Sequence, residues 1–350
     1  MAPIPAPASA LLGKLIRGEN LSFPEMQGAM AEVMEGKWTP AQIGGFLVAL
    51  RIKGETLDEI AAAVTILREK ATAVPVSAHP LVDTCGTGGD HSGSFNVSTA
   101  AAIVAAGGGA AVAKHGNRAM TSQCGSANVL QELGVNLELT PEQAGDCIDS
   151  CRIGFMLATR FHASFKHVTG VRQELGQRTL FNMMGPMLNP ARAKRQLIGV
   201  YALDLTRTLA DVLAQMRAEH VMVVAGTDGM DEITLTAPTK ISELKGGEVR
   251  DYILNPQDLG FSLCAKEDLK GGDATVNAGI IRGILAGRKG PPLDIVLLNA
   301  GAALYVAGLA ADHKQGVALA RESVASGAAR STLEKWVAQS RSYSPAVPGA

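Results

Sequence analysis

The sequence predicts an α/β protein: a small all-helical domain followed by a larger α/β domain with a mainly parallel central sheet. The first observation is that residues 11–73 show helical patterns throughout and no strand pattern. The second is that short apolar strand patterns alternate with helical patterns after residue 75, as in parallel α/β folds. The chain of 350 residues is also long enough for two domains.

The N-terminal part begins with a segment rich in Pro and Ala, and we expect residues 1–10 to be a flexible tail. Three helix-start signals follow, at Ser22, Thr39 and Thr56, each with Glu or Gln three residues later. They divide residues 11–73 into several short helices, which we assign to a small helical domain.

The larger domain begins with the strand LVDTC at 81–85, which runs into a glycine-rich turn. Further strands are predicted at 110–116, 135–139, 153–158, 196–202, 220–226, 232–235, 240–244 and 294–299, with helices at 96–107, at 126–134, from Thr140 and past His167. Ligands of such folds bind at the carboxyl ends of the strands, and the glycine-rich turn is predicted to lie there.

The segment at 171–190 interrupts this alternation with helical pieces that end in Gly-Pro and Asn-Pro. We interpret it as an excursion that returns to the helical domain. The predicted helical domain is therefore 11–73 plus about 170–190, and the α/β domain is 74–169 and 191–350. A cleft between two domains is a common place for a ligand.

The overall composition excludes some functional classes. A net charge of −1 gives no global electrostatic case for binding nucleic acid or a membrane. The apolar stretch 293–310 contains Asn299 and two glycines, so we expect a buried strand and helix rather than a membrane span. The N-terminus lacks a signal-peptide pattern, and the five cysteines form no CxxC ladder. A cytoplasmic location is expected.

The glycine-rich turn carries the first candidate ligand-binding residues, Gly86, Gly88, Gly89 and Asp90. It matches neither GxxxxGK[ST] nor GxGxxG, so alone it is as consistent with a plain turn as with a phosphate site. Polar side chains next to a predicted helix start favour the phosphate site, because they bind phosphate or ribose oxygens or a hard cation. They are Ser94, Asn96, Ser98 and Thr99.

A cationic cluster, Lys114-His115-Gly116-Asn117-Arg118, follows the next predicted strand. Lys114 and Arg118 suit a pyrophosphate, and Asn117 suits the acceptor or a sugar group. His115 is either a neutral hydrogen-bonding partner or an acid–base group. The alternative is a solvated turn with no ligand.

Three more candidates lie far along the chain. Asp231 and Glu232 are adjacent carboxylates after a strand, which is costly unless they are hydrated or bind a cation such as Mg²⁺. Arg172 lies in the interdomain segment and suits a substrate carboxylate. An acidic loop and a helix-surface arginine remain the plain alternatives.

Taken together, these motifs resemble the anthranilate phosphoribosyltransferase family. The matching stretches are DTCGTGGD at 83–90, FNVST at 95–99, KHGNR at 114–118, GSANVL at 125–130, the long segment 166–190, GMDEI at 229–233 and NAGAALYV at 299–306. The resemblance covers nearly everything after the tail. It implies the fold of nucleoside phosphorylases and class III-like phosphoribosyltransferases, and a homodimer formed through the helical domain.

The resemblance also implies substrates, a metal and the residues that bind them. Phosphoribosyl pyrophosphate is expected at Gly86, Gly89, Asp90, Ser94, Asn96, Val97, Ser98, Thr99, Lys114, His115, Gly116, Asn117, Arg118, Ala119, Met120, Thr121, Ser122 and Ser126. Anthranilate is expected at Gly86, Asn117 and Arg172, and Mg²⁺, two ions per subunit, at Ser98, Asp231 and Glu232. Lys114, His115 and Arg118 are the expected catalytic residues.

The chain departs from the family pattern at Thr159 and Ala163, where prolines are usual, and at Cys124. The first two positions line the expected path of the aromatic substrate, so tolerance for substituted anthranilates is in question. Two rival functions stay open at this point: a pyrimidine nucleoside phosphorylase-like enzyme, and a non-catalytic relative that binds nucleic acid.

Overall fold

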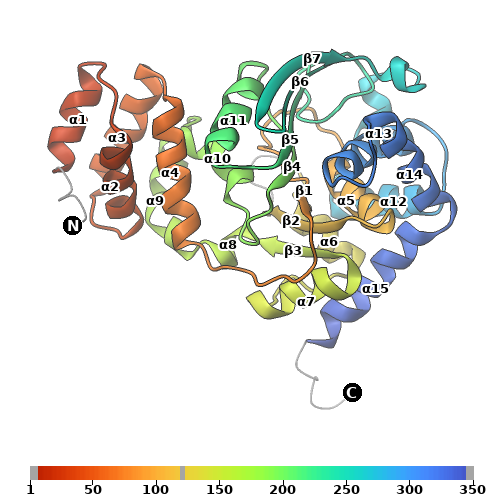
Figure 1. The fold of residues 1–350 in the computed structure, drawn as a ribbon. Helices are drawn as coiled ribbons and strands as arrows, with labels where there is room; N and C mark the ends of the chain where they lie inside the picture. Colours follow the sequence, from red (N-terminus) through yellow and green to blue (C-terminus); the bar gives the residue numbers. More distant parts are fainter. Residues whose placement is uncertain (1–6, 119–122, 344–350) are drawn as a thin grey trace.

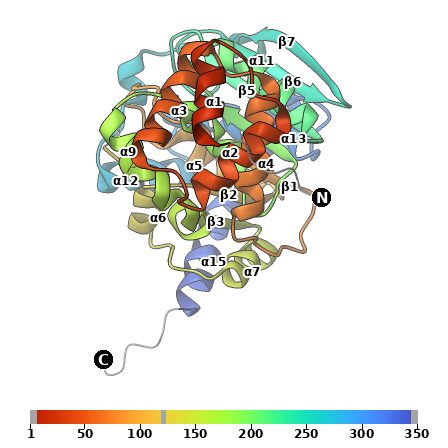
Figure 2. The ribbon, with the colours of Figure 1, turned by 90° about the vertical axis from the view of Figure 1, so that its left-hand side faces the viewer.

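The computed structural model describes residues 7–118 and 123–343. An N-terminal helical bundle lies beside a larger α/β body, with the bundle at the left in Figure 1 and in front in Figure 2. The bundle contains α1 (Ala8–Ile16), α2 (Phe23–Met34), α3 (Pro40–Lys53) and α4 (Leu57–Lys70). Helix α1 begins at Ala8, so the end of the predicted tail is helical.

The predicted helix starts in the bundle are confirmed. Ser22, Thr39 and Thr56 are the N-caps of α2, α3 and α4, and each forms a capping box with the Glu or Gln three residues later. These caps satisfy backbone N–H groups that a helix leaves unpaired at its start. The inward faces of the four helices bury a shared apolar cluster that includes Met30 and Leu47.

The central sheet has seven strands in the order β3-β2-β1-β4-β5-β6-β7. Their bounds are β1 (Leu81–Asp83), β2 (Ala111–Gly116), β3 (Ile153–Leu157), β4 (Arg195–Gly199), β5 (His220–Gly226), β6 (Thr239–Lys245) and β7 (Glu248–Leu254). The first five strands are parallel, and β6 and β7 add an antiparallel hairpin at one edge. The prediction of a mainly parallel sheet is confirmed.

Helices cover this sheet and complete the larger body (Figure 1). They are α5 (Val97–Gly107), α6 (Ser126–Leu133), α7 (Pro141–Cys151), α8 (Ala158–Phe161), α11 (Asp204–Gln215), α12 (Ala274–Leu285), α13 (Pro291–Val306), α14 (His313–Ala325) and α15 (Ala328–Ser342). The alanine-rich α5 is buried against α13, because small side chains let the two helices approach closely.

Three predicted strands are absent from the structure, and one observed strand was not predicted. The stretch 135–139 buries alternate residues, as a strand would, but it is an extended segment held to α15, where Asn136 N–H donates to Ser340 Oγ at 3.0 Å. The stretch 232–235 is a loop. The stretch 294–299 belongs to helix α13, which is buried on most sides and therefore reads as a continuous apolar run. Strand β7 was not predicted because its side chains are largely exposed.

The interdomain segment forms α9 (Lys166–Leu175), α10 (Leu180–Met184) and the short 3-10 helix η2 (Gly185–Leu188). Helix α9 contacts α2 and α3, and α10 contacts α3 and α4. Leu180 and Met184 are buried in the same apolar cluster as the bundle. The segment therefore joins the bundle to the loops at the carboxyl ends of the strands.

Candidate active site

The candidate site lies at the carboxyl ends of β1, β4 and β5, with β2 beside them. Strand β1 sits between β2 and β4, so the chain crosses over in opposite directions on its two sides. Such a switch point leaves a crevice between loops at the strand ends. The loop after β1, residues 84–96, is called the glycine loop below.

Several residues of the glycine loop have a positive backbone φ. Gly88 and Gly89 have φ of 66° and 76°, and His91 has φ of 56°. Glycine adopts these values without strain, which explains the spacing of the motif. A Cβ on Gly86 would lie only 3.0 Å from the carbonyl oxygen of Gly199 at the end of β4. The loop is thus pressed against the neighbouring strand end.

The acidic pair meets the glycine loop directly. Gly88 N–H donates to Asp231 Oδ2 at 2.8 Å, and Asp231 N–H donates to Asp90 Oδ2 at 3.3 Å. Glu232 Oε1 accepts a 3.0 Å hydrogen bond from the backbone N–H of Ser98 in the first turn of α5. Residues more than 130 positions apart in sequence therefore form one acidic centre.

The carboxyl groups of this centre resist ionisation. Burial, and then the nearby Asp90 carboxylate, raises the pKa of Asp231 to about 7. Burial, and then Asp231, raises the pKa of Glu232 well above its ordinary value. Carboxylates that share a site in this way are stabilised by a bound cation. Among the described residues no cluster of three or more His, Cys, Asp or Glu side chains has metal-binding geometry.

Mg²⁺ fits this arrangement despite the small number of protein ligands, because it usually keeps several waters and takes further oxygens from substrate phosphates. The oxygens at this position, two carboxylates and the Ser98 hydroxyl, are hard donors of the kind that this ion prefers. The raised carboxyl pKa values agree with this, since an unneutralised acidic pair is costly.

Lys114 lies beneath the loop rather than at its surface. Its side chain is 2% exposed, and its ammonium group donates to the Thr84 carbonyl and hydroxyl at 3.1 Å and to Ser98 Oγ at 3.4 Å. It is also close enough to Glu232 to oppose the rise in that carboxyl's pKa. The lysine thus supports the floor of the site through Thr84 and Ser98.

His115 faces an apolar wall. Burial, and then the neighbouring His162, lowers the pKa of His115 to about 3, so its ring is neutral at physiological pH. The two imidazole centroids are 5.1 Å apart, and His162 continues to Phe165 and then Phe181 at centroid distances of 5.7 and 5.6 Å. This row of rings is called the aromatic wall below.

Arg172 ends the aromatic wall. Its guanidinium carbon lies 5.3 Å from the centroid of Phe181, and burial lowers its pKa. Arginine keeps its charge even so. A half-buried cation beside aromatic rings is a suitable place for an aromatic carboxylate.

Not all predicted residues converge. Arg118 turns away from the acidic centre: its guanidinium donates to Gln131 at 3.0 Å and lies 4.0 Å from Glu138. Asn117 and Ser126 are adjacent, since Ser126 Oγ donates to the Asn117 carbonyl at 3.3 Å. Ala119, Met120, Thr121 and Ser122 lie outside the described residues. Gly116 approaches Ser126 so closely that a Cβ there would be 2.4 Å from Ser126 Oγ.

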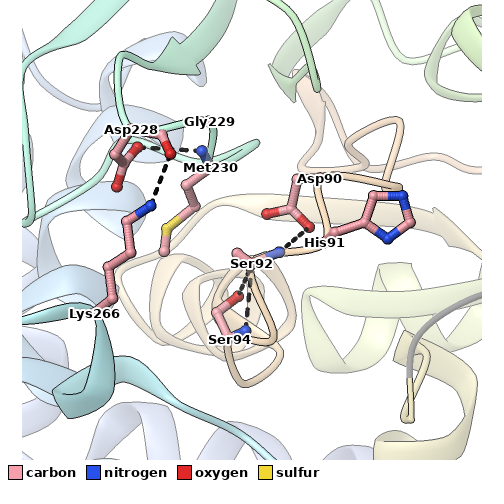
Figure 3. Close-up of a pocket in the computed structure, with 8 residues that line it drawn as sticks. All are labelled: Asp90, His91, Ser92, Ser94, Asp228, Gly229, Met230 and Lys266. Carbon is pink, nitrogen blue, oxygen red and sulfur yellow. Dashed lines mark hydrogen bonds between the residues drawn. The ribbon is translucent and has the colours of Figure 1, made fainter.

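The remaining predicted residues sit at the loop and the start of α5. Val97 and Thr99 are buried, and Gly89 is half-buried. Ser94 lines a cavity of about 200 Å³ between the glycine loop and the loop after β5 (Figure 3). In that cavity Asp90 and Ser94 face Asp228 and Lys266, and the Lys266 ammonium donates to the Asp228 carbonyl at 2.9 Å.

Sequence reasoning missed several residues of this site. Asp83 is fully buried and accepts from Asn189 Nδ2 at 2.7 Å and from the His115 backbone N–H at 3.2 Å. Arg178 donates to the Gly89 carbonyl and stacks on Tyr201, with 3.9 Å from guanidinium carbon to ring centroid. Asp83 and Asn189 both lie inside stretches that match the family, and this was the available sign that each is important. Nothing in the sequence indicated that their side chains contact each other.

Comparisons with known proteins give the same picture. Residues 78–330 match the glycosyl transferase family a/b domain, and residues 9–71 match the helical bundle domain of that family. An anthranilate phosphoribosyltransferase of Afipia carboxidovorans is 52% identical over 95% of this chain and 98% of its own, and that of Thiobacillus denitrificans is 51% identical over 94% and 96%.

Solved structures superpose closely as well. The crystal structure of the Thermus thermophilus anthranilate phosphoribosyltransferase has a TM-score of 0.89 at 44% identity, covering 95% of this chain and 99% of its own. The Saccharomyces cerevisiae enzyme, in complex with phosphoribosyl pyrophosphate (PRPP) and Mg, has a TM-score of 0.88 at 25% identity, covering 96% and 98%.

Proposed function

We propose how this chain, which belongs to the anthranilate phosphoribosyltransferase family, binds its substrates and positions them for reaction. The enzyme transfers the 5-phosphoribosyl group from PRPP to anthranilate, giving N-(5-phosphoribosyl)anthranilate and pyrophosphate. This is the second step of the tryptophan branch from chorismate. Neither the nucleoside phosphorylase-like function nor the nucleic-acid-binding function is favoured.

The contact between the glycine loop and Asp231 is the observation that carries the assignment of residues. It brings backbone N–H groups, the start of α5 and two carboxylates to one strand edge. The direct test follows the loss of anthranilate fluorescence with PRPP and Mg²⁺. No loss with purified protein, or loss that does not need PRPP, would refute the activity.

PRPP is bound, in this proposal, by the glycine loop and the first turn of α5. The Gly88 N–H is bound to Asp231, so the backbone around Gly89, together with the helix dipole of α5, attracts the phosphates. Ser94, Asn96 and Ser98 supply polar side chains at the same edge.

Mg²⁺ would be held by Ser98, Asp231 and Glu232. Once bound it neutralises charge on the departing pyrophosphate. Our proposal of two ions per subunit is supported by Asp90, a third carboxylate that touches the backbone of Asp231. Binding is expected to release protons from Asp231 and Glu232, because their pKa values are raised in the free protein.

The roles of the cationic cluster follow from burial. Lys114 opposes the charge of the acidic centre from below, and it steers Ser98 through a direct hydrogen bond. His115 is a neutral group beside the acceptor, since its pKa is too low for it to carry a proton. For Arg118 to meet pyrophosphate, its guanidinium has to leave Gln131 and Glu138.

Anthranilate is placed along the aromatic wall with its carboxylate on Arg172, near Gly86 and Asn117. Its amine is neutral near pH 7, so attack on C1 of the ribosyl group needs no strong base. Catalysis then rests on positioning and on electrostatic stabilisation of the leaving group.

The homodimer remains a proposal, supported by apolar side chains exposed on the bundle. Ile16 and Ile52 are 77% and 81% exposed, on α1 and α3. We also propose that the enzyme works in the cytoplasm. Across residues 7–118 and 123–343, no helix has the length and apolar character needed to cross a lipid bilayer.

A further inference from the structure

Asn277, in the first turn of α12, reaches the glycine loop from behind. Its side-chain nitrogen donates to Asn96 Oδ1 at 2.9 Å, across 181 positions of sequence. Asn277 is only 2% exposed, so water does not compete for this contact. Asn96 is the N-cap residue of α5 and one of the residues to which we assign PRPP.

The two amides form a relay whose direction is fixed at both ends. At one end the backbone N–H of Gly272, which only donates, bonds to Asn277 Oδ1 at 2.8 Å. At the other end the carbonyl of Cys124, which only accepts, receives Asn96 Nδ2 at 3.1 Å. Between these ends Asn277 must donate and Asn96 must accept. The relay thus connects α12, the glycine loop and the loop after β2.

The segment before α12 is itself fixed to the glycine loop. Phe95 N–H donates to the Leu269 carbonyl at 3.1 Å, and Gly271 N–H donates to the Gly93 carbonyl at 2.9 Å. A Cβ on Gly271 would lie 2.7 Å from both Phe95 Cα and Asn277 Oδ1, so only glycine permits this approach. The start of α12 therefore acts as a rigid support for Asn277.

A carboxylate of the same shape cannot replace Asn277. An aspartate would still accept from the Gly272 N–H, but its second oxygen would face the oxygen of Asn96. Rotating Asn96 by half a turn would relieve that contact and set its oxygen against the Cys124 carbonyl instead. Either way one buried acceptor faces another, which is costly. Two further groups lie near this contact. The Cys124 thiol is hydrogen-bonded with the Asn277 side chain, and the Asp273 carboxylate is close to that thiol.

We propose that Asn277 is a positioning residue for PRPP: it orients the Asn96 amide and thereby sets the spacing between the glycine loop and the loop after β2. It does so from behind the site, without touching the substrate. This inference rests on the proposed placement of PRPP at Asn96.

The test compares Asn277→Asp, Asn277→Ala and wild type by calorimetric titration with PRPP and Mg²⁺ in the absence of anthranilate, followed by steady-state kinetics. We expect Kd and KM for PRPP to rise roughly tenfold or more in both variants, with KM for anthranilate within about twofold of wild type. Gln257→Glu, the same amide-to-carboxylate change at an exposed residue, is the matched control and should behave as wild type.

The outcomes separate clearly. Unchanged PRPP affinity in folded variants, equal losses for both substrates, or failure of both variants to fold would each overturn the positioning role. The titration reports PRPP binding without turnover. Wild-type protein that binds PRPP but does not convert anthranilate would therefore refute the proposed function and leave this inference to be judged on affinity alone.

Discussion

The backbone N–H of Gly88 donates a 2.8 Å hydrogen bond to the carboxylate of Asp231, 143 residues later in the chain. One bond thus joins the loop after β1 to the loop after β5. The bond occupies one oxygen of the Asp231 carboxylate. It also holds the carboxylate at the edge of the sheet to which we assign the PRPP phosphates. The geometry of the phosphate site and of the metal site is therefore set together.

Removing the Arg172 side chain should weaken the binding of anthranilate but not that of PRPP. We expect Arg172→Ala to raise KM for anthranilate by about 10- to 100-fold, the loss of a charge-assisted bond, and to leave KM for PRPP nearly unchanged. Steady-state kinetics with each substrate varied in turn measure this. Gln173→Ala, at the exposed neighbouring position, is the control. Equal effects on both substrates would remove the carboxylate assignment.

Neutralising the acidic pair should remove the metal response. Asp231→Asn combined with Glu232→Gln is expected to lower kcat by roughly a hundredfold or more at saturating Mg²⁺. Titrating Mg²⁺ against initial rate measures the effect. Glu248→Gln, an exposed carboxylate on β7, should keep the wild-type titration. A double variant with wild-type rate and metal dependence would show that the ion binds elsewhere.

The same pair makes stability depend on pH. Because burial raises the pKa of Asp231 to about 7, the folded protein holds this proton more tightly than the unfolded chain. Wild-type stability is therefore lost as pH rises from about 4 through 7. In EDTA we expect Asp231→Asn to match wild type near pH 4 and to exceed its Tm by roughly 2–5 °C at pH 8. A variant less stable than wild type at pH 8 would contradict the conclusion that ionised Asp231 destabilises the folded protein.

Gly199 should tolerate no side chain. A Cβ there would lie 1.5 Å from the Asp231 carbonyl oxygen, so the strand end or the acidic loop must move. We expect Gly199→Ala to lose about 1–3 kcal/mol of unfolding free energy and most activity. Chemical denaturation measures the first and the fluorescence assay the second.

The matched substitution is Gly279→Ala, in the exposed interior of α12, where an added Cβ meets no atom within 4 Å. It should gain about 0.5–1 kcal/mol, because alanine restricts the unfolded chain. If both substitutions behaved alike, the close contact at Gly199 would be without consequence.

Local chemistry determined much of this protein. Capping boxes at Ser22, Thr39 and Thr56 and the alternation of strand and helix patterns require only neighbours in sequence, so the bundle and the parallel sheet were predictable. The glycines of the loop after β1 likewise indicated, from the sequence alone, positions where φ is positive. The family motifs located the candidate site residues along the chain.

The tertiary structure decided what those residues contact. Sequence placed Lys114 and Arg118 together, but the fold buries the first under Ser98 and turns the second toward Gln131. The extended stretch 135–139 alternates like a strand yet pairs with no strand, because α15 occupies its flank. The supports of the site, Asp83 with Asn189 and Asn277 with Asn96, join residues more than 100 positions apart. No local pattern encodes such pairs, since burial and hydrogen-bond direction exist only once the layers have packed.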